Sequence, residues 1–382
     1  MAEAFIVGAV RTPIGKRGGG LAAVHPADLG AHAMRELVER TGVDPAMVDD
    51  VIFGCVDQIG AQTADIARTA WLSAGFPEEV PGVTVDRQCG SSQQAVHFAA
   101  QGVMSGTYDA VVAGGVENMS MVPIASPAFV GMEKGMHQPF DGEGWVGRYG
   151  TQEITQFRGA ELMAQKWGLT RRELEEFSYE SHRRAVCAWT DGRFEREVTP
   201  VDGVARDEGP RADTSLEKMA ELKTLREDGV ITAAVSSQIS DGAAALLIVS
   251  ADAVRRYGLT PRARIDAMTV VGADPVYMLT GPIPATGKVL KRAGLSLGDI
   301  DLFEVNEAFA PVVLAWSRDT GAPLDRTNVN GGAIALGHPL GATGAKLMTT
   351  LLHELERTGG RYGLQTMCEG GGQANATVIE RV

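Results

Sequence analysis

The chain has 382 residues, of which 44% are hydrophobic and 22% are charged, as in ordinary globular proteins; this length suits two or three domains. The formal net charge of −13 argues against a broad nucleic-acid-binding surface, although a local basic cluster could still bind an anion. No apolar run approaches the roughly 20 residues of a membrane span, and no basic residue precedes the apolar residues 4–10, so we expect neither a membrane helix nor a secretory signal.

Short apolar runs alternate with longer helical patterns, which is typical of an α/β fold with buried, mostly parallel strands. The predicted strands are at residues 4–10, 51–54, 110–114, 244–249, 301–305, 365–368 and 374–380. The predicted helices are at residues 27–40, 91–105, 171–188 and 345–357.

Two stretches of the chain resemble each other. Residues 42–55 pass from Gly-Val through an acidic turn into Val-Ile-Phe-Gly-Cys, and residues 294–305 pass from Gly-Leu through an acidic turn into Ile-Asp-Leu-Phe-Glu-Val. Each is followed by a glycine-rich turn, a helix and a strand that ends in glycines. This pattern predicts a duplicated α/β unit, although the identity is weak enough to leave coincidence open.

The segment between the two repeats has a different composition. Residues 118–237 contain clusters of charged residues and only weak strand signals. We expect a polar, partly helical insertion, which is either a solvated excursion or a lid that binds a ligand. The predicted division is therefore a first core half (1–117 plus 238–260), an inserted loop domain (118–237) and a second core half (261–382).

The four cysteines, Cys55, Cys89, Cys187 and Cys368, have neither CxxC nor metal-finger spacing, so we expect no disulfide framework and no metal site, as in a cytoplasmic enzyme. Cys89 precedes an apolar helix, whose positive end and unpaired N–H groups would favour the thiolate. Gly90 permits a tight turn and close approach of a substrate. The alternative is that Cys89 is a small buried hydrophobic residue.

Three further residues lie at strand ends or glycine-rich turns. His338 lies among five glycines and precedes a proline, which indicates a positioned general base or a capping histidine. Cys368 lies at the end of a strand, shortly before three glycines. It is either a proton-transfer group beside backbone N–H groups or a core residue. Asn306 lies at a strand-to-helix junction, where it could also be a helix cap. Their shared placement predicts one active site.

These motifs resemble the thiolase family along almost the whole chain. The resemblance rests on the following stretches: Arg-Thr-Pro-Ile-Gly from Arg11, Cys-Gly-Ser-Ser from Cys89, Gly-Gly-Val-Glu-Asn-Met-Ser from Gly114, Asn-Glu-Ala-Phe from Asn306, Asn-Gly-Gly at Asn330 through to His338-Pro339, and Cys368-x-Gly370. It implies a duplicated, layered α-β-α-β-α sandwich with an inserted loop domain.

The resemblance also implies a role for each residue. Cys89 would attack the 3-keto carbonyl of a 3-oxoacyl-CoA and become acylated. His338 would activate that thiol and, with a water held by Asn306, bind the oxygen of the acetyl thioester enolate. Cys368 would protonate the departing acetyl-CoA carbanion. The N–H groups of Cys89 and Gly370 would form a second oxyanion hole.

Coenzyme A is then a substrate, and no cofactor is expected. The resemblance places Ser237 near its pantetheine arm and Lys223 near its nucleotide end, and makes Met278 and Phe309 substrate-binding residues. It implies a homodimer or homotetramer without nucleic-acid partners.

Three motifs depart from the family pattern. The stretch in the insertion that often reads His-Met-Gly-x-Thr-Ala-Glu reads Thr-Gln-Phe-Arg-Gly-Ala-Glu from Thr155. The usual Met-Gly-Thr-Gly-Pro reads Met-Leu-Thr-Gly-Pro from Met278, and the usual Cys-Ile-Gly reads Cys368-Glu369-Gly370. We therefore favour a degradative 3-oxoacyl-CoA thiolase over a biosynthetic acetoacetyl-CoA thiolase. Three further classes compete with a thiolase: a ketoacyl or hydroxymethylglutaryl-CoA synthase, a non-catalytic acyl-CoA- or lipid-binding relative, and a cysteine hydrolase. The second cysteine, Cys368, argues against the synthases and the hydrolase.

Overall fold

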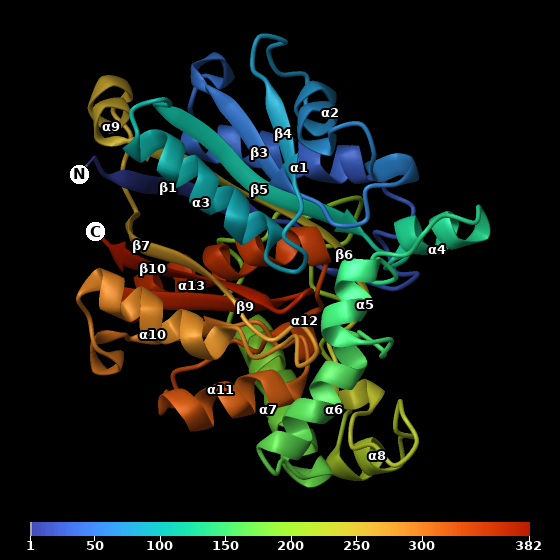
Figure 1. The fold of residues 1–382 in the computed structure, drawn as a ribbon. Helices are drawn as coiled ribbons and strands as arrows, with labels where there is room; N and C mark the ends of the chain where they lie inside the picture. The colour runs from blue at the N-terminus through green and yellow to red at the C-terminus, as the bar shows by residue number, and fades with distance from the viewer. Residues whose placement is uncertain (1) are drawn as a thin grey trace.

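The computed structural model of the protein describes residues 2–382, whose strands form a ten-stranded sheet in the order β4-β3-β5-β6-β1-β7-β10-β9-β8, with β2 paired to β6 (Figure 1). The strands are β1 Ala4–Arg11, β2 Gly15–Lys16, β3 Asp50–Gly54, β4 Gly82–Val85, β5 Ala110–Asn118, β6 Ser240–Ser250, β7 Ala263–Gly272, β8 Leu302–Val305, β9 Tyr362–Glu369 and β10 Gln373–Arg381. Only two residue pairs, Phe5 with Arg264 and Ile6 with Ala263, join β1 to β7, so the sheet has two halves.

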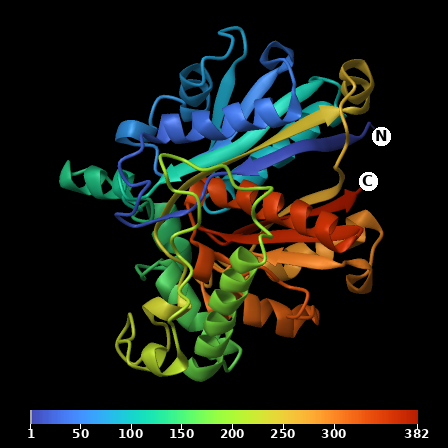
Figure 2. The ribbon, with the colours of Figure 1, turned by 180° about the vertical axis from the view of Figure 1, so that it is seen from behind.

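Helices form three layers around the two sheet halves (Figures 1 and 2). Helices α1 (Pro26–Thr41) and α2 (Ile66–Ser73) pack on the outer face of the first half. Helices α10 (Pro282–Ala293) and α11 (Ala310–Thr320) pack on the outer face of the second half. Helices α3 (Ser91–Met104) and α13 (Thr343–Thr358) lie between the halves and share one apolar core with both. This arrangement confirms the layered α-β-α-β-α prediction.

The duplicated unit is also present in the structure. Helix α1 ends at Gly42 and α10 ends at Gly294, both in the left-handed conformation that favours glycine. A single 3-10 turn (Pro45–Met47 or Leu297–Asp299) then leads into β3 or β8. Each of these strands pairs in parallel with the strand that follows the central helix, β5 or β9. The two halves therefore repeat one structural unit.

The expectation of mostly parallel strands is wrong. Three pairings are parallel, β3–β4, β3–β5 and β8–β9, and the other six are antiparallel. Alternating strands and helices do favour parallel pairing. However, β9 and β10 form a hairpin, and β6 enters the sheet between β5 and β1 from the opposite direction. Strands β4 and β7 escape prediction from the sequence because they are only partly buried.

The segment between β5 and β6 alternates helices with loops, and its α-helices are α4 Ser126–Glu133, α5 Glu143–Tyr149, α6 Gln156–Lys166, α7 Arg171–Thr190 and α8 Leu216–Ala220. Two short helices complete the fold, α9 Ala251–Tyr257 and α12 Ala333–Leu336. A capping box of Thr170 and Glu173 starts α7. No helix among residues 2–382 is long and apolar enough to cross a membrane.

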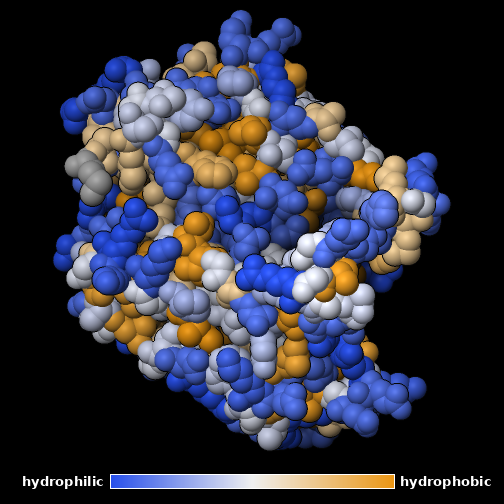
Figure 3. Space-filling model, viewed as in Figure 1, coloured by the Kyte–Doolittle hydropathy of each residue, from blue (hydrophilic) through white to orange (hydrophobic). Residues whose placement is uncertain are grey.

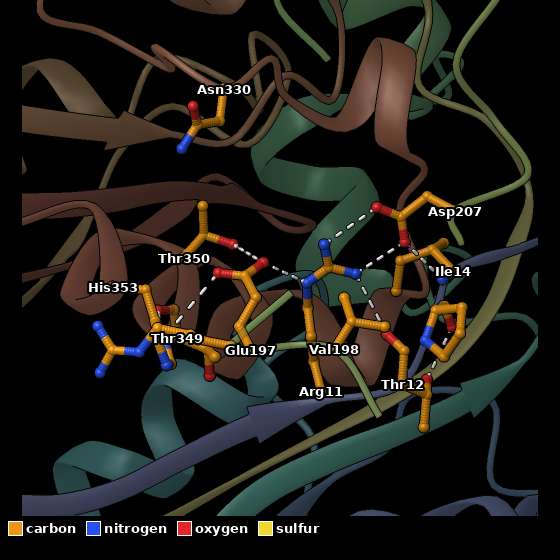
Figure 4. A network of polar contacts seen from close by, with 12 residues as sticks. Arg11, Thr12, Ile14, Glu197, Val198, Asp207, Asn330, Thr349, Thr350 and His353 are labelled. Carbon is orange, nitrogen blue, oxygen red and sulfur yellow. Dashed lines mark hydrogen bonds and ion pairs between the residues drawn. The ribbon is translucent and has the colours of Figure 1, made fainter. Parts of the chain in front are cut away.

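Arg11 at the end of β1 anchors this helical segment to the core (Figure 4). Its buried guanidinium donates from Nε to Glu197 at 2.6 Å and from Nη1 and Nη2 to Asp207 at 2.7 and 3.0 Å. Thr350 of α13 donates to the same Glu197 carboxylate at 3.0 Å. Because buried charges require such pairing, this network fixes the inserted segment against the core.

Candidate active site

Cys89 lies in a tight turn between β4 and α3. Gln88, the residue before it, has a φ of 50°, a left-handed conformation that is uncommon outside glycine. The N–H of Gly90 donates to the Arg87 carbonyl at 3.1 Å, and the N–H of Ser91 donates to the Gln88 carbonyl at 3.0 Å. A Cβ at Gly90 would collide with the side chains of Glu369 and Asn375, so glycine lets the turn pack closely against both. The turn holds Cys89 in one position at the helix start.

The charge state of Cys89 differs from the expectation. Burial and the nearby Glu369 carboxyl raise the pKa of the Cys89 thiol to about 12, while the backbone N–H groups of Cys89 and Gly370 oppose this rise. The N–H groups at the helix start therefore favour the thiolate, as expected, but desolvation outweighs them in the unliganded site. Cys89 needs a base to become a nucleophile. The two N–H groups do face its sulfur.

Cys368 at the end of β9 is fully buried and lies close to Cys89. Burial and then the proximity of Cys89 raise the pKa of Cys368 well above its usual value, so the thiol keeps its proton. Cys368 belongs to an apolar cluster with Met278, Phe309 and Ile334. A protonated thiol beside a second thiol can serve as a proton donor.

His338 lies in the turn between α12 and the 3-10 turn Leu340–Ala342. Its Nδ1 is 2.6 Å from Thr343 Oγ1, and that hydroxyl donates to the Pro339 carbonyl at 2.8 Å. Nδ1 must then carry the ring proton, which leaves Nε2 unprotonated, with a lone pair that can accept a proton. Burial and then Lys346 lower the pKa of His338 to about 3, so the imidazole is neutral at pH 7. It can act as a base through Nε2.

Asn306 connects His338 to the strand that bears Cys368. Its Nδ2 lies 3.3 Å from His338 Nε2, and its backbone N–H donates to the Thr366 carbonyl of β9 at 3.1 Å. Its Oδ1 is buried without a partner among the described residues. The first turn of α13, which follows His338, also contacts the start of α3, since the N–H of Ala345 donates to Ser92 Oγ at 2.9 Å. The structure thus brings the four predicted residues to one place.

The sequence comparisons identify the family. Residues 4–252 match the family described as thiolase, N-terminal domain, and residues 259–381 match thiolase, C-terminal domain.

The chain belongs to the thiolase family.

It is 61% identical to the steroid 3-ketoacyl-CoA thiolase FadA6 of Mycobacterium tuberculosis, over 100% of this chain and 95% of that protein. It is 44% identical to a beta-ketoadipyl-CoA thiolase of Acinetobacter baylyi, over 100% of both chains. The crystal structure of human mitochondrial 3-ketoacyl-CoA thiolase in complex with CoA has a TM-score of 0.90 and 36% identity, covering 100% of this chain and 98% of that one. This thiolase is therefore an acyltransferase.

The other predicted site residues differ in burial: Met278 and Phe309 are buried, Ser237 is half-buried and Lys223 is exposed. The N–H of Ser237 donates to the carbonyl of Ala308 at 2.9 Å, so Ser237 is adjacent to the Asn306 segment. Met278 has a φ of 56° and packs with Phe309 in the cluster that contains Cys368. Lys223 is exposed on the inserted segment.

A cavity of about 170 Å³ lies next to this region. Among its lining residues are His182, Arg211, Lys218, Ala234, Gln238 and Ile334. The backbone carbonyl of Gln238 accepts from the N–H of His338 at 3.2 Å, so the cavity wall continues into the site. Sequence reasoning missed Arg211 and Lys218, because basic residues in a polar insertion look the same as ordinary surface residues.

Proposed function

We propose that this thiolase cleaves 3-oxoacyl-CoA with coenzyme A to acetyl-CoA and a shortened acyl-CoA. The observation that carries the proposal is that Cys89 lies close to Cys368, while Thr343 holds the Nδ1 side of His338 and leaves Nε2 unprotonated beside Asn306. A nucleophile, a base and a separate acid are what cleavage through a covalent intermediate requires.

In the first half-reaction, His338 Nε2 takes the proton of Cys89, and the sulfur attacks the 3-keto carbon. The N–H groups of Cys89 and Gly370, which lower the thiol pKa, would bind the oxyanion that forms. The bond between C2 and C3 breaks, leaving the acyl group on Cys89. The electron pair of the broken bond stays with the departing acetyl-CoA, which becomes an enolate. His338 and a water on Asn306 hold the enolate oxygen. Cys368 then protonates the enolate carbon.

In the second half-reaction, the thiol of coenzyme A attacks the acyl group on Cys89. The Cys368 thiolate left by the first half-reaction takes the proton of the incoming thiol. The released Cys89 sulfur regains its proton from His338, so each group returns to its starting state. No external acid or base is needed.

Coenzyme A would enter along the cavity beside Gln238. Arg211 and Lys218 are cations on its wall, and phosphate groups prefer such donors. Ala233 and Ala234 leave room for a narrow pantetheine arm, which would pass Ser237 on the way to Cys89. Coenzyme A is then a substrate of this enzyme, with no cofactor in the reaction.

The direction of the reaction is part of the proposal. The relatives named as steroid 3-ketoacyl-CoA and beta-ketoadipyl-CoA thiolases support a degradative role with acyl groups larger than acetoacetyl. A biosynthetic role is the second candidate, because the acetyl-CoA acetyltransferase of Bacillus anthracis has a TM-score of 0.89 at 37% identity over 100% of this chain and 99% of that one.

We further propose a homo-oligomer and a cytoplasmic location. Strand β4 is an outer strand of the sheet, and the exposed Leu72, Val83 and Phe98 lie on α2, β4 and α3, where apolar surface is visible (Figure 3). A second copy that pairs along this edge would cover them. The four free cysteines fit a reducing compartment. We also propose that the chain divides functionally into two core halves and the insertion at 118–237.

A thiolysis panel tests the function. Acetyl-CoA release is measured from short, long and ring-bearing 3-oxoacyl-CoA substrates, with and without free coenzyme A. We expect turnover beyond one acetyl-CoA per active site to depend on free coenzyme A and to be faster with the larger acyl groups. Repeated turnover without added coenzyme A would indicate hydrolysis, and activity confined to acetoacetyl-CoA would favour the biosynthetic role.

A further inference from the structure

Glu369 is a buried carboxyl that the proposed reaction does not use. It stands between Cys368 and Gly370, where the thiolase pattern commonly has isoleucine. Because successive strand residues face opposite sides, its side chain lies on the other face of β9 from Cys368 and outside the acyl pocket. The residue is 0% exposed, and neither carboxyl oxygen has a hydrogen-bond partner among the described residues.

The carboxyl packs directly under the nucleophile turn. Glu369 Oε1 occupies the space in which a Cβ of Gly90 would lie. Asn375 Nδ2 lies 2.8 Å from the same point and donates to the Gly90 carbonyl at 2.9 Å. On the far side of Glu369 along the chain, the N–H of Gly370 faces the Cys89 sulfur. Glu369 is therefore close to Cys89 in two ways. Its carboxyl packs against Gly90, the residue after Cys89, and the N–H of the next residue, Gly370, faces the Cys89 sulfur.

The surroundings favour an uncharged carboxyl. A buried carboxylate without hydrogen bonds is costly, and Asn375 Oδ1 is a further buried acceptor without a donor among residues 2–382. Burial raises the pKa of Glu369 to about 8, and Arg87 and then the backbone N–H of Asn375 only partly oppose this. Arg87 donates to Gln373 Oε1 at 3.0 Å instead. Glu369 is thus protonated at pH 7.

The charged and titratable groups around this point are few. The nucleophile turn contributes Cys89, Arg87 and Asp86, and β9 contributes Cys368. Strand β10 contributes the uncharged Gln373 and Asn375, which share the Glu369 face of the sheet. Among these groups, Glu369 and Cys89 would both become negative on losing a proton. Like charges in a desolvated site disfavour each other.

We propose that Glu369 is a positioning residue that controls the ionisation of Cys89: the thiolate of Cys89 forms readily only while the Glu369 carboxyl keeps its proton. The inference rests on the proposed function in taking Cys89 as the nucleophile. When the Cys89 proton moves to His338 Nε2, Glu369 keeps its own proton, and the nucleophile turn holds one negative charge instead of two. Ionised Glu369 keeps Cys89 in the unreactive thiol form.

Alkylation of Cys89 by iodoacetamide tests the proposal, with the Cys89 peptide followed by mass spectrometry from pH 6 to pH 10. Since the thiolate is the reactive form, the wild-type rate should rise about tenfold per pH unit and then level off near pH 8, as Glu369 ionises. Glu369→Gln keeps the shape of the side chain without the charge, and its rate should continue to rise. At pH 9 the variant should react roughly tenfold faster, equivalent to one pKa unit.

Glu380→Gln is the matched control, because it removes a carboxyl from β10 at the opposite end of the strand. This control should keep the wild-type break, which is the levelling-off of the alkylation rate near pH 8. Should Glu369→Gln fail to fold, Glu369→Met supplies an apolar side chain of similar length and should also lose the break. A break retained in either folded variant, or absent from the wild type, overturns the proposal. The assay uses no acyl-CoA, so failure of thiolysis leaves its result intact.

Discussion

The side chains of Asn306 and His338 meet, with Asn306 Nδ2 lying 3.3 Å from His338 Nε2. Thr343 holds the other ring nitrogen at 2.6 Å and fixes the proton there. Nε2 is therefore the ring atom that is available for proton transfer, and Asn306 adjoins it. In the proposed reaction, the same pair binds the oxygen of the enolate.

We predict that Asn306→Ala lowers kcat by roughly 10²–10³, because a donor for the enolate oxygen is lost. The KM for coenzyme A should change little, since Asn306 lies away from the proposed cavity. Steady-state kinetics measures both constants, and a thermal unfolding scan shows whether the fold is intact. A folded variant with kcat within about threefold of the wild type would exclude this role.

Arg211 and Lys218 are expected to bind the phosphates of coenzyme A. Replacing either by alanine should raise the KM for coenzyme A roughly tenfold while kcat stays near the wild-type value, because uniform binding is lost. Lys291→Ala is the matched control, since Lys291 is exposed on α10, outside the inserted segment, and does not line the cavity. An equal effect of all three substitutions would indicate a general charge effect instead of a binding site.

The Arg11 network is expected to be needed for stability. Arg11→Leu leaves the buried Glu197 and Asp207 without their cation and should lower the free energy of unfolding by about 3–5 kcal/mol. The measurement is denaturant unfolding. Arg361→Leu removes an exposed arginine paired with Glu380 and should have little effect. If Arg11→Leu and Arg361→Leu both lower the free energy of unfolding by a similarly small amount, the Arg11 network is not needed for stability.

His97 should make the protein sensitive to acid. Burial lowers the pKa of His97 to about 3, and its Nε2 lies 2.7 Å from Thr377 Oγ1. Below pH 6.5 the unfolded chain binds a proton that the folded chain does not, so the stability from this residue falls as pH falls. Compared with His97→Gln, the wild type should lose roughly 2 kcal/mol more between pH 7 and pH 5. Parallel pH profiles of unfolding would refute this.

The local sequence is enough to predict much of the fold and the site. Apolar periodicity identifies the buried strands such as β5, and glycine-rich turns identify Cys89 and His338. The pKa of Cys89 is not predictable in this way, because it depends on burial and on Glu369, a distant residue in the chain that only the folded sheet brings close. The predicted strand directions fail for the same reason, since β6 joins β1 after a long excursion. Local sequence patterns predict the helices and strands, whereas tertiary contacts determine the directions of the strands and the protonation of buried side chains.

The central claim is that Cys89 carries the acyl group. Incubation with a 3-oxoacyl-CoA in the absence of free coenzyme A, followed by peptide mass spectrometry, tests it most directly. We predict a mass increase equal to the shortened acyl group on the Cys89 peptide, which disappears when coenzyme A is added. An unmodified Cys89 peptide in an enzyme that still turns over, or the same acyl group on Cys368, would contradict the account.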